Sequence, residues 1–393
     1  MRRYRLAILA ESPIPYHISF YRALAARPEL EVIILYLSDL GLSGRTDPGF
    51  GIPLAWGMPL LEGYPHRFLK NFPLSPAAGR FLSLINPGIF PALRKGRYDA
   101  VLIPGYAYLS YWIGFFSAWS LKIPVLMRGE AVLRLARLRG WTGRLKKRLL
   151  SALLRRTRAC LAIGEASHRF YRGFGVPEER IFRSPYAVDN EFFLRESRGW
   201  RSRQAETKRS LGLDPGRPVI LFCGKLTPRK RPEDLLEAFL RLKHPAALLF
   251  VGEGPVRPVL QQKAFGHPEV VFTGFVSQTE LPKYYGLADL FVLPSSEMEA
   301  SPLTINEALA CGLPVILSDA IPSAPEFVQS GENGLLFPVG DVEALRDRLD
   351  TLLGDDSLRK RMGAESLRRI QAWSPQESVA GVLRALHAVA GAS

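Results

Sequence analysis

Short apolar runs recur along the chain, and each is followed by a turn rich in glycine or proline and then by a segment of helical periodicity. Residues 6–10, 101–103, 219–223 and 290–293 are such runs. They lack the apolar–polar alternation of half-exposed strands, so strands buried on both faces are expected. Buried strands that alternate with helices predict an α/β fold with parallel sheets.

The length of 393 residues favours two domains over one large core. Residues 100–121 carry no charge, but Pro104-Gly105 divides them. A buried strand–turn–helix unit therefore explains the run better than a transmembrane helix does. The three cysteines show no metal-binding spacing, which favours a reduced, cytosolic compartment.

Two glutamates stand out in the unit that begins with the strand at 290–293. Glu299 lies in the following polar loop, and Glu307 lies in a helix predicted over 304–310. Ligands of parallel sheets bind where a strand ends and the next helix starts. Ionised carboxylates there would accept hydrogen bonds from sugar hydroxyls. The alternative is that Glu299 is a solvated loop residue and Glu307 a surface helix residue.

A basic loop follows the strand at 219–223. Gly224 permits close approach of the backbone, and Lys225 and Lys230 supply positive charge. A diphosphate needs compact cations and backbone donors at such a strand end. The alternative is a solvated basic loop.

Both segments carry a resemblance. The stretch from Glu299 through Glu307 to residue 316 resembles the E-x7-E region of retaining glycosyltransferases of family 4. Lys225 and Lys230 fall on that family's Gly-Arg-Leu-x3-Lys pattern, with lysine in place of the arginine. The family's Glu-Gly-Phe-Gly is replaced here by Glu299-Ala300-Ser301-Pro302, in which Pro302 has no amide hydrogen to donate.

The resemblance implies the GT-B architecture, in which two Rossmann-like domains face a cleft. Residues 1–190 would then bind the acceptor, and residues 191–372 a nucleotide-sugar, UDP- or GDP-linked. Residues 373–393 would form a helix that packs back on the first domain. It also implies transfer with retention at the anomeric carbon. No metal ion is expected, because the loops contain no aspartate cluster to hold one, and no other cofactor is expected.

The resemblance also implies roles for single residues. Lys225 and Lys230 would neutralise the diphosphate, and Glu307 would accept from the ribose hydroxyls. Glu299 and the backbone amides near Ser301 and Leu303 would hold the sugar. The catalytic candidates are thus Glu299, Lys225 and Lys230. The donor-binding set is Gly224, Lys225, Lys230, Phe275, Val276, Glu299, Ala300, Ser301, Pro302, Leu303 and Glu307, with Phe275 and Val276 against the nucleotide base.

Four residues are candidates for the acceptor side: Tyr16, His17, Arg128 and Glu130. His17, in the loop after the first strand, is a candidate for acceptor contact or proton transfer, with a helix-start packing role as the alternative. Arg128 offers a fork of donors to an anion, and Glu130 would orient it or act as a base. The alternative is a local Arg–Glu pair. The first strand is not followed by G-x-G-x-x-G, which disfavours nicotinamide binding.

The net charge of +15 belongs to the first half of the chain. Residues 1–200 contain 30 Lys+Arg against 14 Asp+Glu. Residues 134–158 contain ten Lys+Arg and no acid, with leucines at helical spacing from Arg144 on. This pattern predicts a basic amphipathic helix suited to anionic lipid. We expect its leucines to face the domain core and its cations to face the membrane.

The sequence therefore predicts a retaining glycosyltransferase that uses a glycan or lipid-linked acceptor in cell-surface polysaccharide, lipopolysaccharide or glycolipid synthesis. We expect it in the cytoplasm, peripheral on the inner face of the cytoplasmic membrane, because no cleavable signal follows the basic start. Nucleic acid is disfavoured as a partner. Two alternatives stay open: a nucleotide-sugar 2-epimerase of the same architecture, and a non-enzymatic protein whose basic half binds membranes or nucleic acid.

Overall fold

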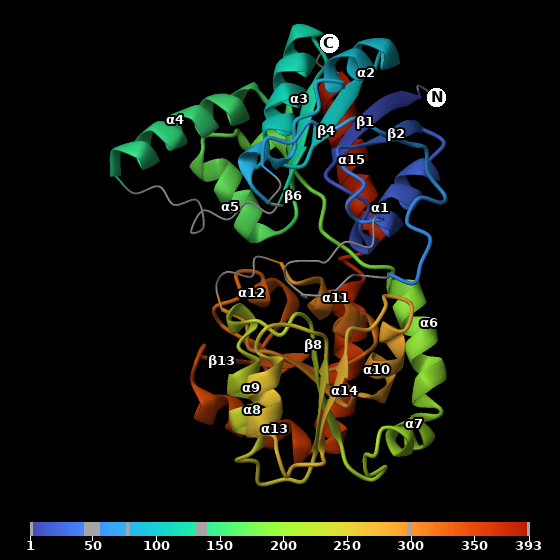
Figure 1. Ribbon diagram of the computed structural model, residues 1–393, viewed down its shortest axis with the longest axis vertical. Helices are drawn as coiled ribbons and strands as arrows, with labels where there is room; N and C mark the ends of the chain where they lie inside the picture. Colours follow the sequence, from blue (N-terminus) through green and yellow to red (C-terminus); the bar gives the residue numbers. More distant parts are fainter. Residues whose placement is uncertain (1–2, 43–55, 76–78, 130–139, 297–300, 391–393) are drawn as a thin grey trace. The chain divides into compact units, whose positions relative to one another are not determined.

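The computed structural model describes residues 3–42, 56–75, 79–129, 140–296 and 301–390 (Figure 1). The chain forms two compact units. The first comprises Met1–Gly44, Pro59–Tyr186 and Pro375–Ser393, and the second comprises Arg45–Met58 and Ala187–Ser374. Each unit is a parallel sheet covered by helices, so the predicted pair of Rossmann-like domains is confirmed.

The sheet of the first unit has the order β3-β2-β1-β4-β5-β6-β7. Strands β1, β4, β5 and β6 are almost wholly buried, which explains their continuous apolar sequences. The strands are β1 Tyr4–Ala10, β2 Leu30–Tyr36, β3 His66–Phe68, β4 Ala100–Ile103, β5 Val125–Arg128, β6 Ala159–Ala162 and β7 Ile181–Arg183. The helices are α1 Pro15–Ala25, α2 Ile89–Gly96, α3 Leu109–Ser120, α4 Gly140–Arg156, α5 Glu165–Gly173 and α15 Pro375–Ala390, with short 3-10 turns at Phe81–Ser83 and Glu178–Arg180.

The last helix, α15, belongs to the first unit, as predicted for residues 373–393. It packs against α1, β6 and β7. Gly381 makes this approach possible, because a β-carbon at that position would lie 2.0 Å from the carbonyl oxygen of Arg183 at the end of β7. The Ser184 hydroxyl donates to the backbone oxygen of Ser378 at 2.9 Å. The chain thus returns to its first unit through a close helix–strand contact.

The sheet of the second unit has the order β10-β9-β8-β11-β12-β13. Its strands are β8 Val219–Cys223, β9 Ala247–Val251, β10 Val270–Gly274, β11 Leu290–Leu293, β12 Val315–Ser318 and β13 Gly334–Phe337. Its helices are α6 Asn190–Arg201, α7 Gln204–Ser210, α8 Pro232–Phe239, α9 Arg257–Lys263, α10 Leu281–Leu287, α11 Leu303–Ala310, α12 Ala324–Phe327, α13 Val342–Leu353 and α14 Asp356–Ile370, and η4 is a 3-10 turn at Pro228–Lys230. The strand order reverses between the neighbours β8 and β11. Ligands of doubly wound sheets bind at such a reversal, beyond the carboxyl ends of the strands.

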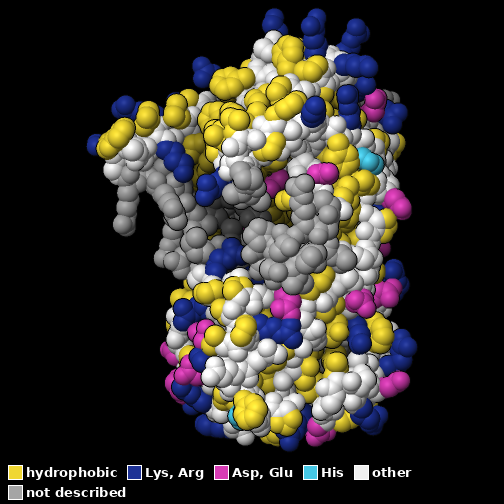
Figure 2. Space-filling model, in the orientation of Figure 1, with side chains coloured by type: hydrophobic (Ala, Val, Ile, Leu, Met, Phe, Trp, Pro, Cys, Tyr) yellow, Lys and Arg dark blue, Asp and Glu magenta, His cyan; other side chains and the backbone are white. Residues whose placement is uncertain are grey.

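Helix α4 confirms the predicted amphipathic helix but corrects the expected position of its leucines. Leu150, Leu153 and Leu154 are buried in the core of the first unit, as predicted. Leu145 and Leu149, however, are 51% and 54% exposed. They are four residues apart and so share one face, which lies beside the buried face of the helix and points to solvent. Helix α4 therefore has a second, outward apolar stripe, and Figure 2 shows hydrophobic side chains interspersed with Lys and Arg along it.

Candidate donor site of the second unit

Lys230 folds back over the end of β8. Gly224, the first residue after the strand, has φ of 146°, a conformation that side chains rarely allow. A β-carbon on Gly224 would lie 3.7 Å from Lys230 Nζ. Lys230 is only 6% exposed, whereas Lys225 is half-buried. The alternative of a solvated basic loop is therefore wrong for Lys230.

Two neighbouring loops pack onto the β8 loop by backbone contacts. Gly252 and Gly254 follow β9, and β-carbons on them would lie 2.0 Å and 2.2 Å from carbonyl oxygens of the β8 loop. From the loop after β11, the amide of Ser296 donates to the carbonyl oxygen of Arg229 at 2.9 Å. Three strand-end loops thus meet around Lys230, at the reversal of the strand order.

Glu307 is completely buried, so its alternative as a surface helix residue is wrong. It lies in the middle of α11, among the buried residues of that helix. The hydroxyl of Tyr285 donates to Glu307 Oε2 at 2.7 Å, and Gln278 Nε2 donates to Oε1 at 2.9 Å. A buried carboxylate is costly unless it is hydrogen-bonded, and here both oxygens are.

The charges of Lys230 and Glu307 act on each other and on the thiol of Cys223. Burial raises the pKa of Glu307 to about 7, against the hydrogen bonds from Tyr285 and Gln278 and the positive charge of Lys230, which lower it. Burial also raises the pKa of the Cys223 thiol, to which the charge of Glu307 adds and which Lys230 opposes. The structure thus brings a lysine and a glutamate from separate segments together at the switch point of the sheet.

The other predicted sugar-binding residues, 299–303, follow β11 in the sequence up to the start of α11. Glu299 and Ala300 lie outside the described residues. Pro302 is buried and immediately precedes α11, with Ser301 half-buried before it and Leu303 as the first residue of the helix. The backbone amides near Ser301 and Leu303, which are predicted to hold the sugar, therefore lie at the start of the helix that carries Glu307. Their role in sugar binding stays a prediction.

Phe275 and Val276 follow β10 and are half-buried. The ring of Trp56 packs edge-on against Phe275, with 5.9 Å between the ring centroids. Gly57 is closely packed too, since a β-carbon there would lie 2.9 Å from the β-carbon of Ser277. A segment from the first half of the sequence thus supports the loop predicted to contact the nucleotide base.

Comparisons with known proteins match the part of the chain that holds this site. The family model described as Glycosyl transferases group 1 matches residues 203–369, which lie within the second unit. Residues 203–369 therefore form a glycosyl transferases group 1 domain. The resemblance found in the sequence is thereby confirmed at the level of this group 1 domain.

Curated relatives match over the same part of the chain. The sulfoquinovosyl transferase SQD2 of Arabidopsis thaliana is 35% identical over 178 residues, which are 45% of this chain and 34% of that protein. A GDP-mannose-dependent alpha-(1-6)-phosphatidylinositol monomannoside mannosyltransferase of Mycolicibacterium smegmatis is 33% identical over 207 residues, 50% of this chain and 52% of that protein. The chain therefore spans about half or less of the length of these relatives.

Solved structures extend the similarity of fold to the whole chain. Anabaena HepE in complex with UDP has a TM-score of 0.74 and 17% identity, covering 96% of this chain and 99% of that one. A glycosyltransferase from Rickettsia africae has a TM-score of 0.76 and 15% identity, with both chains fully covered. The GT-B type of fold, with two Rossmann-like domains, is therefore shown beyond the group 1 domain.

Two of the acceptor-side candidates, His17 and Arg128, meet in the first unit around Tyr186, which the sequence did not single out. The His17 ring lies 6.0 Å from that of Tyr186, and the Arg128 guanidinium lies 4.7 Å from the centre of the same ring. Burial, and secondarily the charge of Arg128, lowers the pKa of His17 to about 4. His17 is therefore a neutral imidazole at pH 7. Tyr16 is half-buried beside it, and Glu130 lies outside the described residues.

Arg128 has a structural role in the first unit. It is 5% exposed, and its guanidinium donates to the carbonyl oxygen of Pro185 at 2.9 Å and to the hydroxyl of Ser378 at 2.8 Å. It thereby links the end of β5 to the chain after β7 and to α15. The predicted contact with an anionic acceptor stays a prediction, because these donors already serve the protein.

Sequence reasoning missed the two residues that hold Glu307. Gln278 lies in a loop of ordinary polar composition, and Tyr285 sits among apolar residues of α10 that indicate core packing. A polar phenol at a core position of a helix is a signal that it needs a partner. The partner became identifiable only when the topology placed α10 beside α11.

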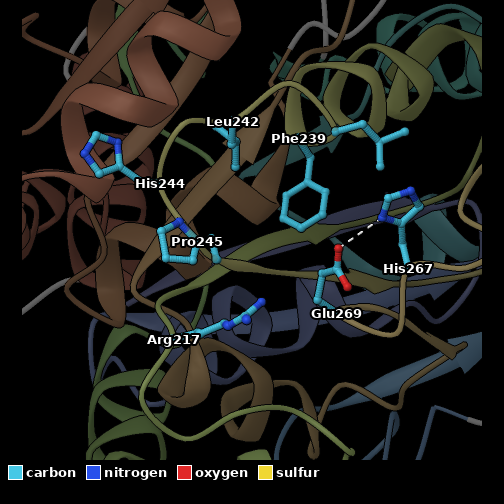
Figure 3. Close-up of a pocket in the computed structure, with 9 residues that line it drawn as sticks. Arg217, Phe239, Leu242, His244, Pro245, His267 and Glu269 are labelled. Carbon is cyan, nitrogen blue, oxygen red and sulfur yellow. Dashed lines mark hydrogen bonds and ion pairs between the residues drawn. The ribbon is translucent and has the colours of Figure 1, made fainter.

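A separate pocket of the group 1 domain lies at the opposite ends of its strands (Figure 3). It measures about 170 Å³ and includes Arg217, His244, His267 and Glu269, which precede β8, β9 and β10. His267 Nδ1 lies 3.1 Å from Glu269 Oε1 on one side of the pocket. Because ligands of doubly wound sheets bind at carboxyl ends of strands, this pocket is distinct from the donor site.

Proposed function

We propose that the protein is a glycosyltransferase that binds a nucleotide-sugar in its second unit and transfers the sugar to an acceptor held by its first unit. The observation that carries the proposal is the burial of Lys230 beside Glu307 at the switch point of a group 1 domain. A buried cation at a strand end suits a diphosphate, and a buried carboxylate with open lone pairs suits ribose hydroxyls.

The transfer proceeds with retention of configuration and without a metal ion. As the bond between sugar and diphosphate breaks, negative charge grows on the leaving phosphate. Lys225 and Lys230 stabilise this charge in a site that needs little reorganisation. The acceptor oxygen forms the new bond to the anomeric carbon on the face that the phosphate leaves, and the leaving phosphate takes the proton of the acceptor hydroxyl. Glu299 and the amides near Ser301 and Leu303 hold the sugar during this step.

The names of the relatives favour UDP- or GDP-linked donors and a glycan or lipid-linked acceptor. One relative is named as GDP-mannose-dependent and as acting on a phosphatidylinositol monomannoside, and one structural neighbour was solved with UDP. A role in cell-surface polysaccharide, lipopolysaccharide or glycolipid synthesis follows from such acceptors.

A thermal-shift screen of UDP-, GDP- and ADP-sugars tests donor binding on the purified full chain. A donor at about 100 times its Kd stabilises the folded state by about 2.7 kcal/mol. We therefore expect one nucleotide series to raise Tm by about 5 °C or more, and EDTA to leave the shift unchanged. If no nucleotide-sugar raises Tm, the basic first half is the better lead and the protein is a surface-binding protein.

The 2-epimerase alternative is tested with the donor that the screen selects. An epimerase converts its donor with no acceptor present. A transferase consumes the same donor at an appreciable rate only when an acceptor glycan or glycolipid is added. Conversion of the donor to an epimer in the absence of acceptor would replace the transferase proposal.

We further propose that the first unit works on the cytoplasmic face of an anionic membrane through α4. Trp141, Leu145 and Leu149 form an exposed stripe, and Trp141 is 72% exposed. Exposed cations surround the stripe: Arg144, Lys146, Lys147, Arg148, Arg155 and Arg156. Each basic residue near an anionic surface contributes about 1 kcal/mol, and the apolar stripe would enter the headgroup layer. No helix among the described residues is long and apolar enough to span a membrane.

Vesicle sedimentation checks this proposal. Vesicles of phosphatidylglycerol and phosphatidylcholine should retain the protein, whereas phosphatidylcholine vesicles should not, and salt should weaken the binding. Reversing three α4 charges (Arg144→Glu, Lys147→Glu and Arg148→Glu together) should lower binding at least tenfold, since about 3 kcal/mol of attraction is removed.

The contribution of the exposed apolar stripe of α4 is tested against a control substitution in the second unit. Leu145→Ser with Leu149→Ser should weaken vesicle binding, whereas Phe265→Ser, at a 90% exposed position, should not. Equal binding of all variants, or equal binding to both kinds of vesicle, would contradict the membrane role of α4. It would leave the proposed donor chemistry unaffected.

A further inference from the structure

The carboxylate of Glu307 is held from two sides by different elements. Gln278 in the loop after β10 donates to Oε1 at 2.9 Å, and Tyr285 in α10 donates to Oε2 at 2.7 Å. Each oxygen thus accepts one hydrogen bond from the protein. A carboxylate oxygen has two lone-pair sites, so each keeps one for a further donor.

Tyr285 is fixed by its own surroundings, and the loop of half-buried Gln278 packs against Gly57. Tyr285 is fully buried, and its ring packs edge-on against Phe193 at 5.9 Å. The Gln278 loop is braced by Gly57, which leaves no room for a β-carbon next to Ser277. One oxygen of Glu307 is therefore held by a fully buried phenol, and the other by a side chain on a closely packed loop.

We propose that Gln278 and Tyr285 are positioning residues, which hold the two oxygens of Glu307 so that their remaining lone pairs point at two adjacent hydroxyls of a bound nucleotide ribose. This inference rests on the proposed function. A cis-diol presents two donors side by side, which matches two carboxylate oxygens that each have one acceptor site left. A carboxylate free to rotate would lose this match for much of the time.

The pKa of Glu307 depends on the groups around it, so a change in this pKa reports the loss of a hydrogen bond from Gln278 or Tyr285. Lys230 from η4, Cys223 from β8, Cys311 at the end of α11 and Tyr285 all interact with its charge. Lys230 is the group among these four that is charged at neutral pH. Burial raises the pKa of Glu307 to about 7, and the two hydrogen bonds lower it. Loss of either bond should raise this pKa further.

The experiment compares Tyr285→Phe and Gln278→Leu with the wild-type chain, with Tyr284→Phe as the matched control. Tyr284 is the adjacent tyrosine of α10 and is half-buried. Binding of UDP, GDP and ADP is measured by calorimetry between about pH 6 and 9. We expect the first two variants to bind about tenfold more weakly near neutral pH. Their midpoint for binding should move to higher pH, and Tyr284→Phe should match the wild type.

The outcomes separate this inference from the proposed function. A lower Tm with an unchanged pH midpoint would mean that the two residues only stabilise the fold, and the inference would be wrong. If the wild type binds no nucleotide at any pH, the proposed function fails instead. The pH dependence of Tm of the free variants then still reports the pKa of Glu307, and an unmoved midpoint there would also overturn the positioning role.

Discussion

Replacing Lys230 by methionine is expected to lower kcat about 10²–10³-fold while the fold is retained. Lys230 lies over Gly224 at the end of β8 and is nearly buried, so its charge acts where water screens it little. Methionine keeps most of the side-chain volume and removes the charge. The loss should appear in single-turnover rates of sugar transfer, because the lysine acts on charge that develops during bond cleavage.

The matched control is Arg229→Met, the preceding residue of the same loop. Its side chain is exposed, and its backbone oxygen accepts a hydrogen bond from the amide of Ser296. The same loss of charge at Arg229 should change kcat by less than about threefold. Rates should be measured at about pH 8.5 as well, because loss of Lys230 raises the pKa of Glu307. Near-normal turnover of Lys230→Met would remove the phosphate role.

The second unit was largely predictable because its chemistry is local in sequence. A strand, a glycine and two lysines within a few residues define the β8 loop, and the helix with Glu307 follows its strand directly. Parallel strands place such loops at one edge of the sheet. The sequence could not predict that Lys230 would be buried and Lys225 only half-buried, since this depends on how Gly252 and Gly254 pack onto the loop.

The first unit was predictable in fold but less so in its site. His17 and Arg128 are over a hundred positions apart, and they meet around Tyr186, which follows the last strand. No spacing rule connects three such positions. Likewise, periodicity identified α4 as amphipathic, but it could not tell which leucines face the core. The leucines form one broad apolar stripe in the sequence, and periodicity does not show that only one side of that stripe packs against the core.

Glu307→Gln is expected to lower kcat/KM for the donor about 10–100-fold at about pH 8, because hydrogen bonds to a charged acceptor are replaced by weaker ones. The amide keeps the shape of the carboxylate but cannot accept at both ends. In the wild type, burial raises the pKa of Glu307 to about 7. Donor binding should therefore strengthen as pH rises through about 7, and Glu307→Gln should show no such rise.

The free protein should show the opposite dependence of stability on pH. The pKa of Glu307 is about 7 in the folded state and has its ordinary, lower value in the unfolded state. Its contribution to stability is present in full below the unfolded pKa and is lost as pH rises through the folded pKa. The Tm of the wild type should thus fall relative to that of Glu307→Gln between about pH 5 and 8, and donor should reverse the trend. Parallel Tm curves for the two proteins would mean that Glu307 is not held as a buried, titrating carboxylate. The donor site would then have to be assigned to other residues of the switch point.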